Sequence, residues 1–184
     1  MAARAIIQTP VGPLGIEASE RGLQAVHFDP PATFLQSHDT GDDASGAMLD
    51  HARRELDAYF AGDLTSFTVP VALRTTIFQR RVYDFLLTIP FGTTTTYGAI
   101  AKAIHDPNAM RAVGHANGRN PIPIVVPCHR VIGADGTLTG FGGGIERKRW
   151  LLDHERRVIA GLGRSLVPEV ARDAPTLFSS PSRT

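Results

Sequence analysis

The sequence predicts an α/β N-terminal part over residues 1–75 and a mainly α C-terminal part over residues 76–156 that contains a helix-turn-helix. Three observations support this prediction. Short apolar or alternating segments with turn residues between them fill the first 28 positions, apolar residues recur at helical spacing from Thr76 onward, and two short helical segments flank a tight polar turn. The chain has 184 residues, of which 42% are hydrophobic, which suffices for one compact domain or two small domains packed together.

Three short strands are expected at the N-terminus, over residues 5–9, 14–18 and 23–28, because turn residues separate them at hairpin spacing. A polar loop follows, and apolar residues at helical spacing predict a helix over residues 47–60, which Gly62 ends. Residues 67–73 alternate in polarity and indicate a further strand. No pattern typical of catalysis is found in this part.

The C-terminal part begins with a predicted helix over residues 76–88, which Thr76 can cap. Two short helices over residues 96–104 and 109–117, joined by a polar turn, have the proportions of a helix-turn-helix. Such pairs are also common in α-rich domains, so this pattern alone leaves DNA binding open. A last helix is expected over residues 144–155, and residues 157–184 are predicted to form a flexible tail.

Charge is unevenly divided along the chain. Residues 1–76 carry 5 Lys and Arg against 10 Asp and Glu, whereas residues 77–157 carry 11 against 6. Only the second half is therefore suited to a polyanion, although a two-part protein can also divide its charge by chance. No apolar run approaches the roughly 20 residues of a membrane span, and the N-terminal apolar run is too short for a signal peptide. We expect no contact with a membrane.

Cys128 is the single cysteine of the chain, so the sequence excludes an intramolecular disulfide and a zinc site with several thiolates. We expect a cytoplasmic protein with no metal and no cofactor. Three prolines in eight residues lie within or next to the apolar run 122–126, which predicts that Cys128 ends a stiff, extended and buried segment. His129 and Arg130 follow and favour a thiolate, and the glycine-rich loop 133–144 leaves room for a substrate. In an extended segment, however, Cys128 and His129 would point to opposite faces unless a turn or a water connects them. A lone buried cysteine is also commonly a small hydrophobic residue, which is the alternative interpretation.

Residues 127–131 read Pro-Cys-His-Arg-Val, within the run Asn-Gly-Arg-Asn-Pro-Ile-Pro-Ile-Val-Val-Pro-Cys-His-Arg-Val-Ile. Gly-Thr-Leu-Thr-Gly-Phe-Gly-Gly-Gly (136–144) and Arg-Lys-Arg-Trp-Leu-Leu-Asp-His-Glu (147–155) follow in order. This resembles the O6-alkylguanine-DNA alkyltransferases of the bacterial Ogt type, strongly over residues 76–156 and weakly over the N-terminal part, where Thr-Pro-Val-Gly-Pro-Leu (9–14) matches. The resemblance implies a ribonuclease H-like N-terminal domain and a winged-helix-like C-terminal domain.

The resemblance also implies that the protein repairs duplex DNA by moving the alkyl group of O6-alkylguanine irreversibly to Cys128, after the base has flipped out of the helix. His129 matches the base that reaches the thiol through a water, and Glu155 matches the carboxylate that orients this histidine. Asn120 matches a hinge residue, and Tyr97 matches the donor of a proton to the departing guanine. Since the chain offers no way to remove the alkyl group from a thioether, each molecule should act once.

Further residues match the DNA-contacting and pocket positions of this family. Arg111 matches the arginine that fills the space of the flipped base. The other matched positions are Thr96, Ala112, Gly118 and Arg119 at the DNA, and Val131, Phe141 and Gly142 in the substrate pocket. Phe141 stands where many members carry a tyrosine, so it can form a pocket wall but has no hydroxyl to donate a hydrogen bond. The expected partner is double-stranded DNA that contains O6-alkylguanine, and the expected state is a monomer.

The residues leave several alternatives open. O4-methylthymine and bulkier O6-alkyl groups are further candidate lesions, and several copies could assemble cooperatively on DNA. Burial alone would raise the pKa of the Cys128 thiol, but we expect His129 and Glu155 together to lower it. Competing functions are a lesion-binding protein without catalysis, a transcription factor that uses the helix-turn-helix, and a cysteine hydrolase, which would need an oxyanion hole.

Overall fold

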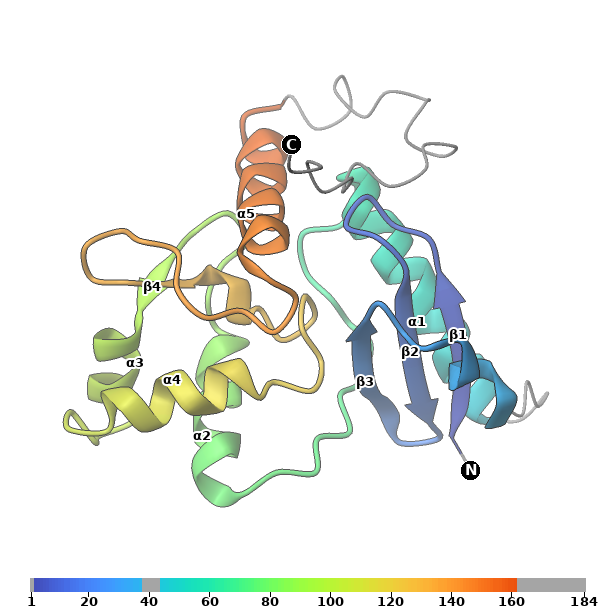
Figure 1. Cartoon of the computed structure of the whole chain (residues 1–184), viewed down its shortest axis with the longest axis horizontal. Coiled ribbons are helices and arrows are strands. Elements are labelled where there is room, and N and C mark those ends of the chain that lie inside the picture. Colours follow the sequence, from blue (N-terminus) through green and yellow to red (C-terminus); the bar gives the residue numbers. More distant parts are fainter. Residues whose placement is uncertain (1, 38–43, 162–184) are drawn as a thin grey trace, which may run out of the picture.

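The computed structural model describes residues 2–37 and 44–161 (Figure 1). The N-terminal part is a three-stranded sheet followed by a short 3-10 helix and one long helix. Its elements are β1 (Ala3–Ile7), β2 (Leu14–Ser19), β3 (Gly22–Phe28), the 3-10 helix η1 (Ala32–Ser37) and α1 (Ala44–Ala61).

The C-terminal part is mainly helical, so the predicted fold class is confirmed. Its elements are α2 (Ile77–Leu86), β4 (Thr95–Thr96), α3 (Tyr97–Ala103), α4 (Met110–Gly118), the 3-10 turn η2 (Cys128–Arg130), β5 (Val131–Ile132) and α5 (Ile145–Ile159). Among the described residues, no helix has the length and apolar character needed to cross a membrane.

The N-terminal sheet is antiparallel in the order β1-β2-β3, and α1 packs across one of its faces (Figure 1). Leu14, Ile16 and Ala18 alternate along β2 and are fully buried, as a strand with one face on the core requires. The helix predicted over residues 47–60 is present and begins earlier, at Ala44.

The strand predicted over residues 67–73 does not form. Val71 makes only an isolated bridge to Leu23. The amides of Thr68 and Val69 donate to the buried Glu55 carboxylate at 2.9–3.0 Å, and Pro70 has no amide hydrogen. Among the described residues, the pairing with β3 is therefore limited to two hydrogen bonds, from the Ala72 amide to the Leu23 carbonyl and from the Leu23 amide to the Pro70 carbonyl, both at 2.8 Å.

Thr76 caps α2 as predicted. Its hydroxyl accepts a hydrogen bond from the Gln79 amide at 3.2 Å, and the Gln79 side chain accepts one from the Thr76 amide at 3.0 Å, which completes a capping box. We expect Thr76→Ala to lower the free energy of unfolding by about 1 kcal/mol, because one helix N–H loses its partner. Urea unfolding measures this, with Thr75→Ala as the control; equal midpoints for the two variants would contradict the role of the cap.

The helix-turn-helix consists of α3 and α4, which pack against each other. Thr96 caps α3 by accepting a hydrogen bond from the Ala99 amide at 3.2 Å. Directly before α3, Thr95 and Thr96 of β4 pair in parallel with Val131 and Ile132 of β5. This pairing connects the start of the helix-turn-helix to the segment that follows Cys128.

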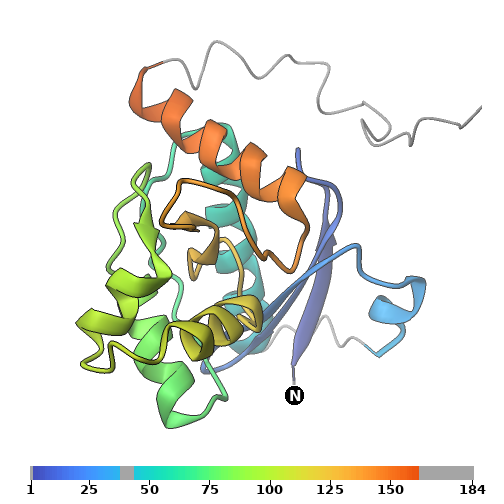
Figure 2. The ribbon, with the colours of Figure 1, turned by 60° about the vertical axis from the view of Figure 1, so that its left-hand side comes forward.

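The last helix, α5, lies between the two parts of the chain and extends beyond its predicted end at residue 155 to Ile159. Residues 157–159, assigned to the flexible tail from the sequence, are therefore helical, because no helix-breaking residue precedes Gly161, where φ is +74°. The remainder of the predicted tail, 162–184, lies outside the described residues. Figures 1 and 2 both show the Cys128 segment between α4 and α5.

Candidate active site

The segment before Cys128 is buried as predicted, but it is a tight turn and not an extended strand. Pro123 and Val126 form a bridge, and Ile124 between them has a φ of +77°. The Asn120 side chain closes the turn: its amide donates to the Val126 carbonyl at 2.7 Å, and its oxygen accepts from the Ile122 amide at 3.0 Å. Prolines exclude a helix, but they do not exclude a chain reversal that a side chain stabilises.

Cys128 and His129 lie in the 3-10 turn η2, in which the Arg130 amide donates to the Pro127 carbonyl at 3.1 Å. This turn replaces the alternation of an extended segment and supplies the change of direction that the two neighbouring side chains need. Cys128 is 3% exposed and His129 is fully buried. Both groups are therefore shielded from bulk water.

Glu155 is buried and forms hydrogen bonds with four of the described residues. His129 Nε2 lies 2.7 Å from its Oε1, the Tyr59 hydroxyl donates to Oε1 at 2.9 Å, and the Gly92 amide donates to Oε2 at 2.7 Å. Arg130 donates from Nε and Nη2 at 3.0–3.2 Å. Burial opposes the ionisation of Glu155, but the hydrogen bonds of His129 and Arg130 and the charge of Arg130 outweigh this effect and lower its pKa to about 2.

Because Glu155 is ionised, it can only accept, and His129 must donate from Nε2. Burial lowers the pKa of His129 in spite of the neighbouring carboxylate, so the imidazole is neutral at neutral pH. Its other nitrogen, Nδ1, then carries a lone pair. Nδ1 is buried and has no hydrogen-bond partner among the described residues. Glu155 thus holds His129 in the tautomer that can accept a proton.

The expectation of a lowered thiol pKa is wrong for the free protein. Burial raises the pKa of Cys128 to about 11, and the opposing interactions with Asn120 and Lys148 do not compensate for it. Arg130, which the sequence placed beside the thiol, instead points to Glu155 and to the Ile89 carbonyl, at 2.6 Å. A guanidinium that is neutralised by a carboxylate has little effect on the pKa of a neighbouring thiol.

Lys148 is the residue of this site that sequence reasoning missed. It is fully buried, and its Nζ donates to the Val131 carbonyl at 2.6 Å and to the Thr139 carbonyl at 2.7 Å. The ammonium interacts electrostatically with Cys128. A signal was available, because Lys148 precedes the buried Leu151 and Leu152 by three and four positions and so shares their face of the helix.

Cys128 opens into a cavity of ≈ 210 Å³. Two of the predicted pocket residues, Phe141 and Gly142, line this cavity. It is also lined by Asn120, which was predicted as a hinge residue, and by Gly118, which was predicted to contact DNA. Val131 does not line it; its side chain is fully buried and its carbonyl accepts from Lys148. The walls also include three residues of the N-terminal strand β3, which the sequence did not indicate: Val26, His27 and Phe28.

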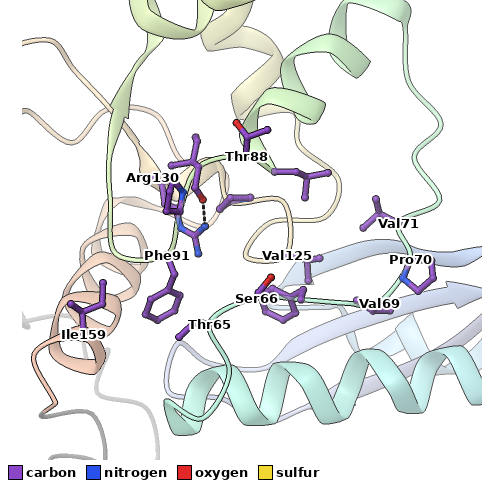
Figure 3. Close-up of a pocket in the computed structure, with 15 residues that line it drawn as sticks. Thr65, Ser66, Val69, Pro70, Val71, Thr88, Phe91, Val125, Arg130 and Ile159 are labelled. Carbon is purple, nitrogen blue, oxygen red and sulfur yellow. Dashed lines mark hydrogen bonds between the residues drawn. The ribbon is translucent and has the colours of Figure 1, made fainter.

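A larger cavity of ≈ 680 Å³, lined in part by Arg130, lies between residues 65–71 and the turn that follows α2 (Figure 3). Arg130 is its single titratable lining residue, and this guanidinium is already bound to Glu155 and Ile89. Cys128 and His129 do not line it. We therefore place the chemistry of this protein in the smaller cavity.

The predicted DNA-contacting residues occupy one helix and the start of another. Arg111 and Ala112 are exposed in the first turn of α4, and Gly118 and Arg119 are exposed at its end. The Tyr97 hydroxyl, at the start of α3, lies 3.3 Å from the Thr139 carbonyl of the glycine-rich loop. The structure thus brings Asn120, Cys128, His129 and Glu155 together and leaves Arg111 and Ala112 on the outer surface.

Fold and site together define a two-domain protein that contains a helix-turn-helix and a buried cysteine. The histidine that follows this cysteine is hydrogen-bonded to a buried carboxylate. The chain belongs to the 6-O-methylguanine DNA methyltransferase family. The DNA binding domain of that family matches residues 77–157, and its ribonuclease-like domain matches residues 3–73. The similarity is to the Ogt type, so this is a DNA-repair protein of the methylated-DNA–protein-cysteine methyltransferase class.

Individual relatives agree with this assignment. The methylated-DNA–protein-cysteine methyltransferase of Methanosarcina acetivorans is 47% identical over 151 residues, which cover 82% of this chain and 96% of that protein. The enzyme of that name from Mycobacterium bovis is 50% identical over 157 residues, covering 82% and 90%. The Mycobacterium tuberculosis OGT crystallised in complex with DNA has a TM-score of 0.73 at 49% identity and covers 83% of this chain and 92% of its own.

Proposed function

We propose that this protein accepts the alkyl group of O6-alkylguanine on Cys128, once per molecule, after the damaged base has flipped out of duplex DNA. One observation carries the proposal: the cavity into which Cys128 opens is lined by the end of α4 and by the glycine-rich loop, and the next residue, His129, is hydrogen-bonded to Glu155 with its Nδ1 left without a partner among the described residues. A base inside a duplex is out of reach of a buried sulfur, so the base must leave the stack.

The chemistry balances with groups of this chain. The Cys128 proton passes to Nδ1 of His129 through a water, the sulfur forms a bond to the alkyl carbon, and the bond from that carbon to O6 breaks. The guanine leaves as an anion and takes a proton from the Tyr97 hydroxyl, and the proton on His129 then passes through solvent to the Tyr97 phenolate, so that both residues return to their starting states. Because burial raises the pKa of the thiol to about 11, the thiol of the free protein is protonated at neutral pH, and its proton is proposed to move during the reaction. The thioether product has no good leaving group, so the reaction stops.

Arg111 is proposed to fill the space that the flipped nucleotide leaves, because a guanidinium can stack and donate hydrogen bonds at the same time. We expect Arg111→Ala to slow repair of O6-methylguanine in duplex DNA by at least about tenfold, whereas reaction with free O6-methylguanine stays within about twofold, since flipping costs a few kcal/mol only in a duplex. Single-turnover rates on both substrates measure this. Arg80→Ala, which removes another exposed arginine of the C-terminal part, is the control; equal losses on both substrates would contradict the role of Arg111.

The experiment that tests the function is to incubate excess O6-methylguanine duplex with the protein and follow its intact mass and the amount of repaired DNA. The expected result is one added methyl group on Cys128 and one repaired base per protein molecule. Cys128→Ser should bind the duplex and repair nothing. Binding without a gain in mass would indicate a lesion-binding protein, and repair beyond one equivalent would indicate a hydrolase.

The same assay with an O4-methylthymine duplex tests the second proposed lesion, for which an added methyl group on Cys128 is expected. We further propose that the protein acts in the reducing cytoplasm, because its reaction requires a free thiol. We propose that it acts as a monomer, because one chain supplies all the residues of the proposed reaction.

A further inference from the structure

The N-terminal domain contributes a wall to the Cys128 cavity. Phe28, at the end of β3, lines this cavity together with Phe141 of the glycine-rich loop, although the two residues belong to different domains. We propose that Phe28 sets the size of the alkyl group that this protein accepts, because it fixes the position of Phe141 in the wall of the cavity that Cys128 also lines. The inference rests on the proposed function, since it takes the cavity to be the site of the flipped base.

The contact between the two rings is specific in its geometry. Their centroids lie 5.5 Å apart at an interplanar angle of 63°, an edge-to-face arrangement. Phe28 also packs against the backbone of the loop: a Cβ atom added at Gly143 would lie 2.7 Å from the Phe28 ring and 2.9 Å from the Phe141 ring. The loop can approach Phe28 this closely only because residue 143 is a glycine.

Phe28 is itself held in place. The Arg147 guanidinium lies 5.2 Å from the centroid of its ring and donates to the Asp29 carboxylate and to the Val11 carbonyl, both at 2.7 Å. The same guanidinium donates to the Gly143 carbonyl at 3.1 Å. Arg147 therefore joins the N-terminal domain to the glycine-rich loop at the position of Phe28, and Phe28 acts as a rigid wall.

The size of the alkyl group that fits the cavity depends on how firmly Phe141 is held. Phe141 has no hydroxyl that could fix it by a hydrogen bond, so its position depends on packing, and Phe28 is its aromatic partner. A methyl group reacts well only if the base is held close to the sulfur, which a fixed wall achieves. A bulky aromatic group such as benzyl needs Phe141 to move. The intact wall thus favours O6-methylguanine over O6-benzylguanine.

The test compares single-turnover alkyl transfer to Cys128 from duplexes that contain O6-methylguanine or O6-benzylguanine. In Phe28→Ala, the ratio of the benzyl rate to the methyl rate should rise about tenfold, because the wall is removed and Phe141 gains freedom. Phe28→Leu, which keeps most of the bulk, should give an intermediate ratio and serves if the alanine variant does not fold. Phe78→Ala is the matched control: this half-buried phenylalanine lies in α2 and lines neither cavity, and its ratio should equal that of the wild type.

A ratio that stays the same in both Phe28 variants would overturn the inference, as would an equal loss of both rates in Phe28→Ala and Phe78→Ala. The wild-type reactions separate this outcome from a failure of the proposed function. If the wild type gains mass from the methyl duplex, the function holds whatever the variants do; if it gains mass from neither duplex, the function fails, and the inference fails with it.

Discussion

Glu155→Gln is expected to slow alkyl transfer by at least about a hundredfold, the contribution of a well-placed general base. The Glu155 carboxylate accepts from His129 Nε2 at 2.7 Å and thereby leaves the lone pair on Nδ1. A glutamine can turn its NH₂ group to Nε2, which moves the imidazole proton to Nδ1 and removes the acceptor for the thiol proton. The measurement is the single-turnover rate of methyl transfer from O6-methylguanine duplex.

Asp153→Asn is the control, because this carboxylate is about half exposed on the same helix and pairs only with Arg156 among the ion pairs of the described residues. Its rate should match the wild type within about twofold, the size expected from an exposed ion pair. A rate for Glu155→Gln as high as that of the control would remove the histidine–carboxylate pair from the mechanism.

Glu155→Gln should also lower the free energy of unfolding by about 3–5 kcal/mol at neutral pH, because the buried Arg130 guanidinium loses its counter-charge. The pKa of Glu155 is lowered in the folded protein, to about 2 from an ordinary value of 4.5, so its ionised form contributes stability above pH 4.5 that is lost as pH falls through about 2. The difference in stability between wild type and variant should therefore shrink over that range. Urea unfolding at several pH values measures it, and a difference independent of pH would contradict this account.

Lys148→Met is expected to have the second largest effect, on the reactivity of the thiol. The Lys148 ammonium favours the Cys128 thiolate against the effect of burial. Its removal should raise the thiol pKa above about 11 and lower the rate of alkylation by iodoacetamide at pH 9 by about tenfold, since only the thiolate reacts. The Val131 and Thr139 carbonyls also lose their donor, which should cost about 1–3 kcal/mol of stability for each group.

Mass spectrometry of Cys128 alkylation against pH measures this effect. In the wild type, the rate should rise by about tenfold per pH unit from neutral pH and level off near pH 11. Lys102→Met replaces the only other lysine, which is exposed in α3, and its profile should equal that of the wild type. A plateau near neutral pH would show that the thiol is ionised before DNA binds and would contradict the effect of burial.

Much of this protein could be predicted from neighbouring residues alone. The three strands, the cap at Thr76 and the helix-turn-helix follow from local periodicity and from turn residues, because these signals act over a few positions of the chain; the first strand nevertheless covers Ala3–Ile7 and not the predicted residues 5–9. The order of the motifs around Cys128 indicated the family, and the matches to both of its domains confirmed it. The burial of residues 122–126 also followed from their apolar side chains, although their turn did not.

Tertiary structure decided the environment of the thiol and the part that the N-terminal domain plays in it. Tyr59 donates to Glu155 across 96 positions of the chain, and Phe28 meets Phe141 between domains, so no local pattern could show either contact. The spacing of Lys148 from Leu151 and Leu152 indicates the buried face of α5, but only the tertiary structure shows that its ammonium acts on Cys128. The thiol pKa depends on burial and on these distant partners. The adjacent residues His129 and Arg130 suggested a lowered thiol pKa, whereas the pKa is raised. The free energy of a buried charge depends on its neighbours in space and not on its neighbours in sequence.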